Sequence, residues 1–168
     1  MNYLDEINYI KKLISSGEKK DKELADKLLN KIYSLNPQDF FLENFYGAFL
    51  ALDNNEINTA IKKFENSIKL NKEFSEPYYN LGRIYFAKQN YLESEFFLKQ
   101  AITLDIYNLH YKNLLGQIYL KLHKYDEAIY IFNIIRLFLI IFTKFVLQLL
   151  IRKITNTKLI ENNLISIT

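Results

Sequence analysis

The sequence contains no cysteine and very little glycine, proline or histidine. The absence of cysteine among 168 residues excludes disulfides, thiolate metal sites and cysteine nucleophiles, and it fits a reducing compartment. Four glycines are too few to build a loop that cradles phosphate groups, and the phosphate-loop, serine-elbow and zinc-protease motifs do not occur. These absences argue against the commonest classes of enzyme site.

The two histidines do not form a recognisable site either. His110 and His123 lie apart, without a spaced carboxylate or second histidine that would complete a metal or acid–base group. Asp126 and Glu127 are adjacent, but they stand at the expected start of a helix, where negative charge favours the helix dipole. We therefore expect no enzymatic activity, no catalytic residue, no metal and no cofactor.

Negative charge is missing from one end of the chain. Residues 1–127 hold seventeen basic and eighteen acidic residues, whereas residues 128–168 hold five basic residues and one acidic residue. Because the net charge of residues 1–127 is close to zero, this part of the chain is not expected to bind along a nucleic acid backbone. The N-terminal segment carries Asp5 and Glu6 where a signal peptide would need positive charge, so we expect a cytoplasmic protein.

A short phrase occurs twice. Residues 81–86 read LGRIYF and residues 115–120 read LGQIYL, and their glycines are 34 residues apart. The same step aligns small residues and large apolar residues on either side, which is the pattern of two helices that approach closely. The aligned sets are Ala48, Gly82 and Gly116; Ala60, Ser94 and Ala128; and Phe64, Leu98 and Phe132.

The apolar spacing is helical throughout, and no alternating strand pattern is seen. We predict a helical hairpin in each of four units, the first of them degenerate, with polar turns at 53–55, 88–90 and 122–124. An apolar face in the first helix, at about 3–16, comprises Ile7, Ile10, Leu13 and Ile14, and Ser16-Gly17 ends it. Connections between units are expected at Asn36-Pro37, Asn71–Pro77 and Asp105–Asn108. The predicted units are 3–36, 41–74, 75–108 and 109–142.

The third and fourth units resemble the tetratricopeptide (TPR) repeat. The residues that carry this resemblance are Tyr78, Tyr79, Asn80, Leu81, Gly82, Tyr85, Tyr91, Ser94, Leu98 and Ala101, followed by Leu114, Leu115, Gly116, Tyr119, Tyr125, Ala128 and Phe132. The usual tryptophan is replaced by Tyr78 and Lys112, and the proline after the second helix survives only as Pro37. The resemblance covers about 1–140 and implies an all-α, right-handed superhelical solenoid of antiparallel hairpins.

The resemblance also implies a protein–protein interaction scaffold, or adaptor, that binds an unknown protein or peptide in its concave groove. First helices line that groove in the family. The corresponding residues are Phe45, Phe49, Leu52, Tyr79, Asn80, Arg83, Phe86, Asn113, Gln117 and Lys121, with Leu42 and His110 beside them. The aromatic residues could instead form the core between repeats, and the polar ones a merely solvated face. The cations of the family's clamp for a terminal carboxylate are missing, and an RNA-binding helical repeat remains a remote alternative.

The C-terminal segment, 137–168, departs from the repeat. No glycine follows Gly116 and no proline follows Pro77, so we expect the last helix to run from about Tyr125 to about Lys153, roughly 43 Å. Thr155-Asn156-Thr157 is the first expected stop.

Four interpretations of this tail remain open. It could cap the solenoid, mediate self-association or partner binding, contact a membrane through residues 137–151 as a peripheral helix, or be a frameshifted or truncated end.

Overall fold

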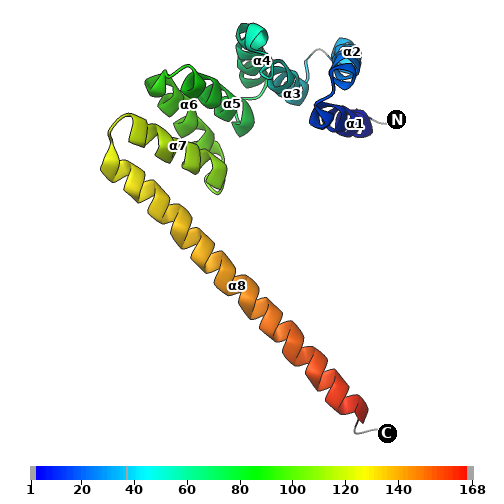
Figure 1. The fold of residues 1–168 in the computed structure, drawn as a ribbon, viewed down its shortest axis with the longest axis vertical. Coiled ribbons are helices and arrows are strands. Elements are labelled where there is room, and N and C mark those ends of the chain that lie inside the picture. Colours follow the sequence, from blue (N-terminus) through cyan, green and yellow to red (C-terminus); the bar gives the residue numbers. More distant parts are fainter. Residues whose placement is uncertain (1–2, 37, 166–168) are drawn as a thin grey trace. The chain divides into compact units, whose positions relative to one another are not determined.

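The computed structural model describes residues 3–36 and 38–165, with side chains for 5–36, 38–53, 55–150 and 152. Within these ranges the regular elements are all helices, as the sequence predicts (Figure 1). The chain divides into two compact units, Met1–Tyr111 and Lys112–Thr168. This division falls inside a helix, ahead of the boundary near residue 140 that the repeat pattern indicates.

The first unit consists of three helical hairpins. In each hairpin one helix packs against the next, and α4 also packs against α5. The expected first connection at Asn36-Pro37 includes Pro37, which lies outside the described residues. The elements are α1 (Tyr3–Ser16), α2 (Lys19–Leu35), α3 (Phe40–Leu50), the short 3-10 helix η1 (Asn54–Glu56), α4 (Ile57–Leu70), α5 (Ser75–Ala87) and α6 (Tyr91–Leu104).

Local chemistry explains where these helices begin and end. Gly17 takes a positive φ of 73° between α1 and α2, a conformation that glycine adopts without strain. The Asp39 carboxylate accepts hydrogen bonds from the backbone N–H groups of Phe41 and Leu42, at 2.8 and 3.1 Å, and so caps α3. The expected connection Asn71–Pro77 is too long, because α5 already begins at Ser75. Pro77 is tolerated there because the first turn of a helix does not need its N–H.

The 34-residue period is also visible in the backbone of the turns. Gln89 and His123 have φ values of 59° and 58°, the left-handed conformation that commonly ends a helix. The residue after each one donates its backbone N–H across the turn, Asn90 to the Tyr85 carbonyl and Lys124 to the Tyr119 carbonyl, both at 2.9 Å. The third and fourth hairpins therefore turn in the same way.

The second, third and fourth hairpins each cross at a helical glycine. A Cβ built on Gly82 would overlap the side chain of Leu98, and one on Gly116 would come within 2.7 Å of the Phe132 ring. In the second hairpin the equivalent close approach is at Gly47, where a Cβ would lie 2.9 Å from Phe64. The sequence alignment assigns this role to Ala48. This assignment is wrong by one residue, because α3 begins one residue earlier than the 34-residue step from α5 predicts.

We predict that Gly82→Ala destabilises the protein by about 1–3 kcal/mol, because Leu98 is fully buried and has no room to yield. At an unobstructed helix position the same change would stabilise by about 0.5–1 kcal/mol. Gly116→Ala is the matched comparison and should cost less, because Phe132 is only half-buried. Urea unfolding of the three proteins measures the difference. A more stable Gly82→Ala protein would contradict the close crossing.

A buried ion pair lies within the second hairpin, and Tyr33 of α2 links it to the first hairpin. The Lys63 ammonium lies 3.3 Å from Oε2 of Glu43, whose side chain is 4% exposed. The Tyr33 hydroxyl donates to Oε1 of the same carboxylate at 2.6 Å, and Lys63 lies 3.7 Å from the centre of the Tyr33 ring. No hydrogen bond reaches Oε2, so the charge of Lys63 alone compensates that oxygen. Helices α2, α3 and α4 are thus tied at one point.

Lys63→Met should destabilise the protein by about 3 kcal/mol, because it leaves the Glu43 carboxylate buried without a countercharge. Adding Glu43→Gln removes that charge while keeping an acceptor for Tyr33, so the double variant should recover most of the loss. Lys62→Met, at the exposed neighbouring position, is the control and should have little effect. Equal stabilities of Lys63→Met and Lys62→Met in urea would show that the pair does not matter.

The second unit contains most of α7 (Leu109–Lys121) and all of α8 (Tyr125–Ile165). Ala128 is buried on α8, and Phe132 packs against Gly116 of α7. The expected long helix is present, but its expected stop at Thr155-Asn156-Thr157 is wrong, since all three residues are helical. With 41 residues α8 is about 61 Å long. Without glycine or proline, the polar triplet alone does not break it.

Candidate functional site

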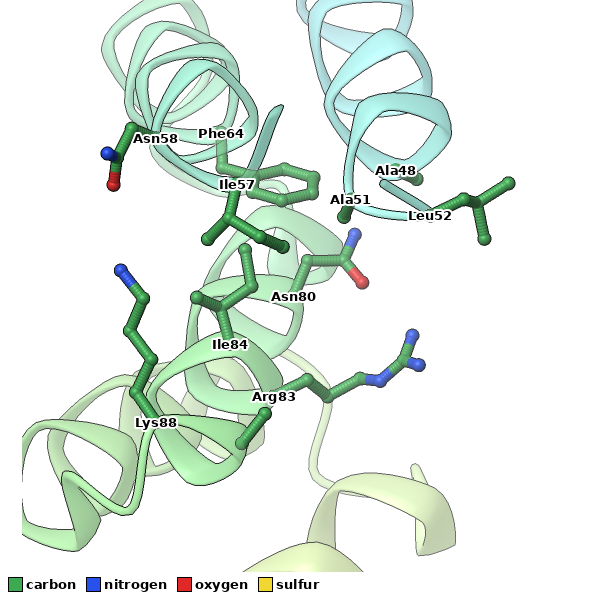
Figure 2. Close-up of a pocket in the computed structure, with 11 residues that line it drawn as sticks. Ala48, Ala51, Leu52, Ile57, Asn58, Phe64, Asn80, Arg83, Ile84 and Lys88 are labelled. Carbon is green, nitrogen blue, oxygen red and sulfur yellow. The ribbon is translucent and has the colours of Figure 1, made fainter. Parts of the chain in front are cut away.

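A pocket of about 550 Å³ lies in the first unit between the second and third hairpins (Figure 2). This volume is in the range of sites that hold a small molecule or a few side chains of a peptide. Three helices and one turn supply its walls. The lining residues are Ala48, Ala51 and Leu52 from the α3 end, Ile57, Asn58 and Phe64 from α4, and Asn80, Arg83, Ile84, Ala87 and Lys88 from the α5 end.

The pocket combines an apolar wall with two cations. Ile57, Phe64 and Ile84 lie between α4 and α5, and Arg83 and Lys88 extend on opposite sides of Ile84 in Figure 2. No aspartate or glutamate is among the lining residues, so the two positive charges have no countercharge in the pocket wall. An occupant with an apolar group and a negative charge would therefore be complementary to it.

Asn80 is held in place by a chain of amide contacts. Its side-chain N–H donates to the Asn44 amide oxygen at 2.9 Å, and the Asn44 amide donates to the Glu76 carboxylate at 3.0 Å. Asn44 is almost fully buried between the two hairpins. Asn80 therefore presents its amide at the pocket from a fixed position, since a buried amide network resists rearrangement.

Arg83 is positioned by a stack of aromatic rings. The Arg83 guanidinium carbon lies 5.8 Å from the centre of the Tyr79 ring, and Tyr79 stacks on Tyr111 with 4.6 Å between ring centres. The Tyr111 hydroxyl lies 3.2 Å from the Ser75 hydroxyl. Burial raises the pKa of Tyr111 above its usual value, so this ring stays neutral under physiological conditions. The exposed Arg83 side chain thus has an aromatic support on its α5 side.

The structure brings together three of the groove residues that the sequence predicts. Leu52, Asn80 and Arg83 line the pocket, and Tyr79 contacts Arg83. Leu52 is 61% exposed, so its apolar side chain is available at the rim.

The other aromatic residues predicted for the groove have partners in the core or in their own hairpin. Phe49 is only 5% exposed and belongs to the core of the first hairpin and α3, as does the fully buried Leu42. Phe45 stacks on Phe41 with Lys11 above its ring. Phe86 packs on Tyr91 of the next helix. For these residues the alternative interpretation, core packing, describes the observed contacts better than a groove surface.

In the second unit, Asn113, Gln117 and Lys121 are exposed. They follow one another at four-residue steps, so they form a polar stripe along α7. His110, one turn earlier in the sequence, is exposed as well.

Sequence reasoning missed Lys88, Asn58 and Ile57, which contribute a cation, an amide and an apolar wall. The repeat pattern places Lys88 in a turn, and it does not indicate the two α4 residues because only first helices are expected to line the groove. The available signal was the small pair Ala48 and Ala51, which leaves space at the end of α3 that α4 and α5 then border. Among the described residues, no group of three or more histidines and carboxylates could hold a metal ion.

Comparison with known proteins agrees with the hairpin architecture. A profile of the family described as anaphase-promoting complex, cyclosome, subunit 3 matches residues 53–133. Among curated proteins, no sequence matches the chain. Solved structures do match. MamA superposes with a TM-score of 0.64 at 20% identity, over 76% of this chain and 72% of that one.

Two further solved structures are similar. PilF of Pseudomonas aeruginosa has a TM-score of 0.64 at 18% identity, over 76% of this chain and 58% of that one. YrrB, described as a TPR protein with an unusual peptide-binding site, has a TM-score of 0.57 at 21% identity, over 61% of this chain and 53% of that one. The chain is an all-α array of helical hairpins, and its fold is that of the tetratricopeptide repeat proteins.

Proposed function

We propose that the chain is a non-catalytic scaffold that holds a segment of a partner protein in the pocket between the second and third hairpins. The observation that carries this proposal is the pairing of an apolar wall with two cations, Arg83 and Lys88, that face no carboxylate in that wall. Two further observations support the proposal. The fold is one that serves as an interaction scaffold, and the similar protein YrrB is described as having a peptide-binding site.

The pocket chemistry indicates what kind of segment fits. A large apolar side chain would displace water from the accessible lining residues Ala51, Leu52 and Ile57, while a carboxylate would pair with Arg83 on one side or Lys88 on the other. Asn58 and Asn80 could donate to, or accept from, the backbone of an extended peptide. We therefore propose a partner segment in which an apolar residue stands next to an aspartate or glutamate.

We also propose that the polar stripe of Asn113, Gln117 and Lys121 contacts a partner, because its amide and ammonium groups are exposed. For catalysis, by contrast, the pocket wall supplies little. Apart from Lys88 it offers amides, a guanidinium and apolar side chains, none of which is a ready nucleophile or proton carrier at neutral pH.

Selection of random peptides displayed on phage against the full chain tests the proposed pocket. We expect the selected peptides to be enriched in an apolar residue beside Asp or Glu and depleted in Lys and Arg. Arg83→Glu should weaken the selected peptides by about tenfold or more, because it reverses a charge at the rim. Affinity should also fall as salt is added.

Lys20→Glu is the matched control, since it makes the same charge reversal at an exposed position in the first turn of α2. Negative charge there favours the helix dipole, so the variant should fold normally and bind like the wild type. Basic peptides, or peptides whose binding is unaffected by Arg83→Glu, would show that the pocket is not the binding site.

A further inference from the structure

Helix α8 exposes apolar side chains in every direction. The six consecutive residues from Leu137 to Phe142 are all leucine, isoleucine or phenylalanine, and each is between 42% and 59% exposed. Thr143 is the first polar residue after them. Six consecutive helical residues point around more than a full turn. Phe145, Leu147, Leu149 and Leu150 continue the exposed apolar surface. A surface of this size is not stable in water without a covering partner.

The polar residues of this segment are nevertheless sorted to one side. At 100° per residue, Arg136, Lys144, Gln148 and Arg152 fall within one half of the helix circumference. Phe138, Phe142, Phe145 and Leu149 fall in the other half, which continues the side that carries Ala128 and Ile135. Because α7 has only 13 residues, it can cover about 20 Å of α8 at most. The aromatic side beyond Ile135 therefore extends past its packing partner within the second unit.

Every charged residue in this part of α8 is basic. No aspartate or glutamate occurs between Glu127 and Glu161, while Arg136, Lys144 and Arg152 lie within that interval. A basic side opposite an aromatic and aliphatic side is the pattern of a helix that lies in the plane of a membrane surface. The charge is complementary to the phosphates of anionic lipids.

We propose that residues 137–150 of α8 bind the surface of an anionic lipid bilayer. In this arrangement Phe138, Phe142 and Leu149 enter the boundary of the acyl chains. Arg136 and Lys144 remain among the lipid headgroups, where their long side chains pair with phosphate.

By length and composition alone, α8 could also cross a membrane. The interval between Arg136 and Arg152 disfavours crossing, because its 15 residues span about 22 Å, less than the hydrocarbon core of about 30 Å. Lys144 would moreover lie in the middle of that core, where a charge is costly. An in-plane helix avoids both problems.

A second copy of α8 is a less suitable occupant. A paired helix covers one narrow stripe of its partner, so a seam along the aromatic side would leave Leu139 and Leu150 of the apolar half exposed. Helix pairs are also commonly selected by opposite charges beside the seam, and this part of α8 carries basic charges alone. A bilayer covers the broad apolar side and places the flanks among headgroups.

Flotation of the full chain with lipid vesicles tests this proposal. We expect binding to vesicles of phosphatidylcholine with about a third phosphatidylglycerol, and much weaker binding to phosphatidylcholine alone. Phe142→Ser/Leu149→Ser should reduce binding by about tenfold or more, because two inserted side chains are lost. Arg136→Gln/Lys144→Gln should reduce binding to the anionic vesicles by about fivefold for each charge removed.

Leu137→Ser/Ile140→Ser is the control, since it replaces two equally exposed apolar residues outside the aromatic side. It should bind almost as well as the wild type, and circular dichroism should show the same helix content in all variants. Equal loss in both serine pairs, equal binding to both kinds of vesicle, or no binding at all would overturn the proposal. So would a stable oligomer in sedimentation equilibrium that Phe142→Ser/Leu149→Ser dissolves and vesicles leave intact.

Discussion

The close approach of two helices at one small residue is the constraint on which the hairpins depend. Gly47, Gly82 and Gly116 each stand where a side chain would collide with Phe64, Leu98 or Phe132 of the following helix. This close contact lets each helix bury its apolar face against the other, whereas a single helix would leave that face exposed to water. In the third hairpin the Ser94 hydroxyl also donates to the Gly82 carbonyl at 2.6 Å, a bond that needs this short separation.

The candidate pocket follows from how neighbouring hairpins meet. The Asn44–Glu76 and Asn80–Asn44 hydrogen bonds and the packing of α4 on α5 join the second hairpin to the third. The small side chains of Ala48 and Ala51 leave space beside that junction, and α5 places Arg83 and Lys88 at its edges. Phe64, Ile84 and Asn80 therefore serve both the packing of the hairpins and the proposed pocket, whereas the exposed cations Arg83 and Lys88 can change without loss of the core.

The 34-residue repeat was enough to predict the helices, because the spacing of its glycines and of its apolar residues both indicate where the two helices of a hairpin cross. It did not predict which side of α3 faces outward. Phe49 corresponds to a groove residue in the repeat register, but in the structure it packs on the first hairpin. The repeat pattern of that hairpin is too weak to indicate this contact. Lys88 could not be predicted because it follows the last residue of α5, and the direction of its side chain depends on the conformation of the turn. The end of α8 was missed because Thr155-Asn156-Thr157 lowers helix propensity without interrupting the backbone hydrogen bonds.

The most direct test of the account exchanges charges across the pocket. A selected acidic peptide and its counterpart with Lys in place of Asp or Glu are titrated against the wild type and against Arg83→Glu, and the four dissociation constants form a double-mutant cycle. If the pocket holds the peptide through Arg83, each single change weakens binding and the double change restores part of it. Additive losses, with no recovery in the doubly exchanged pair, would contradict a contact between the peptide carboxylate and Arg83.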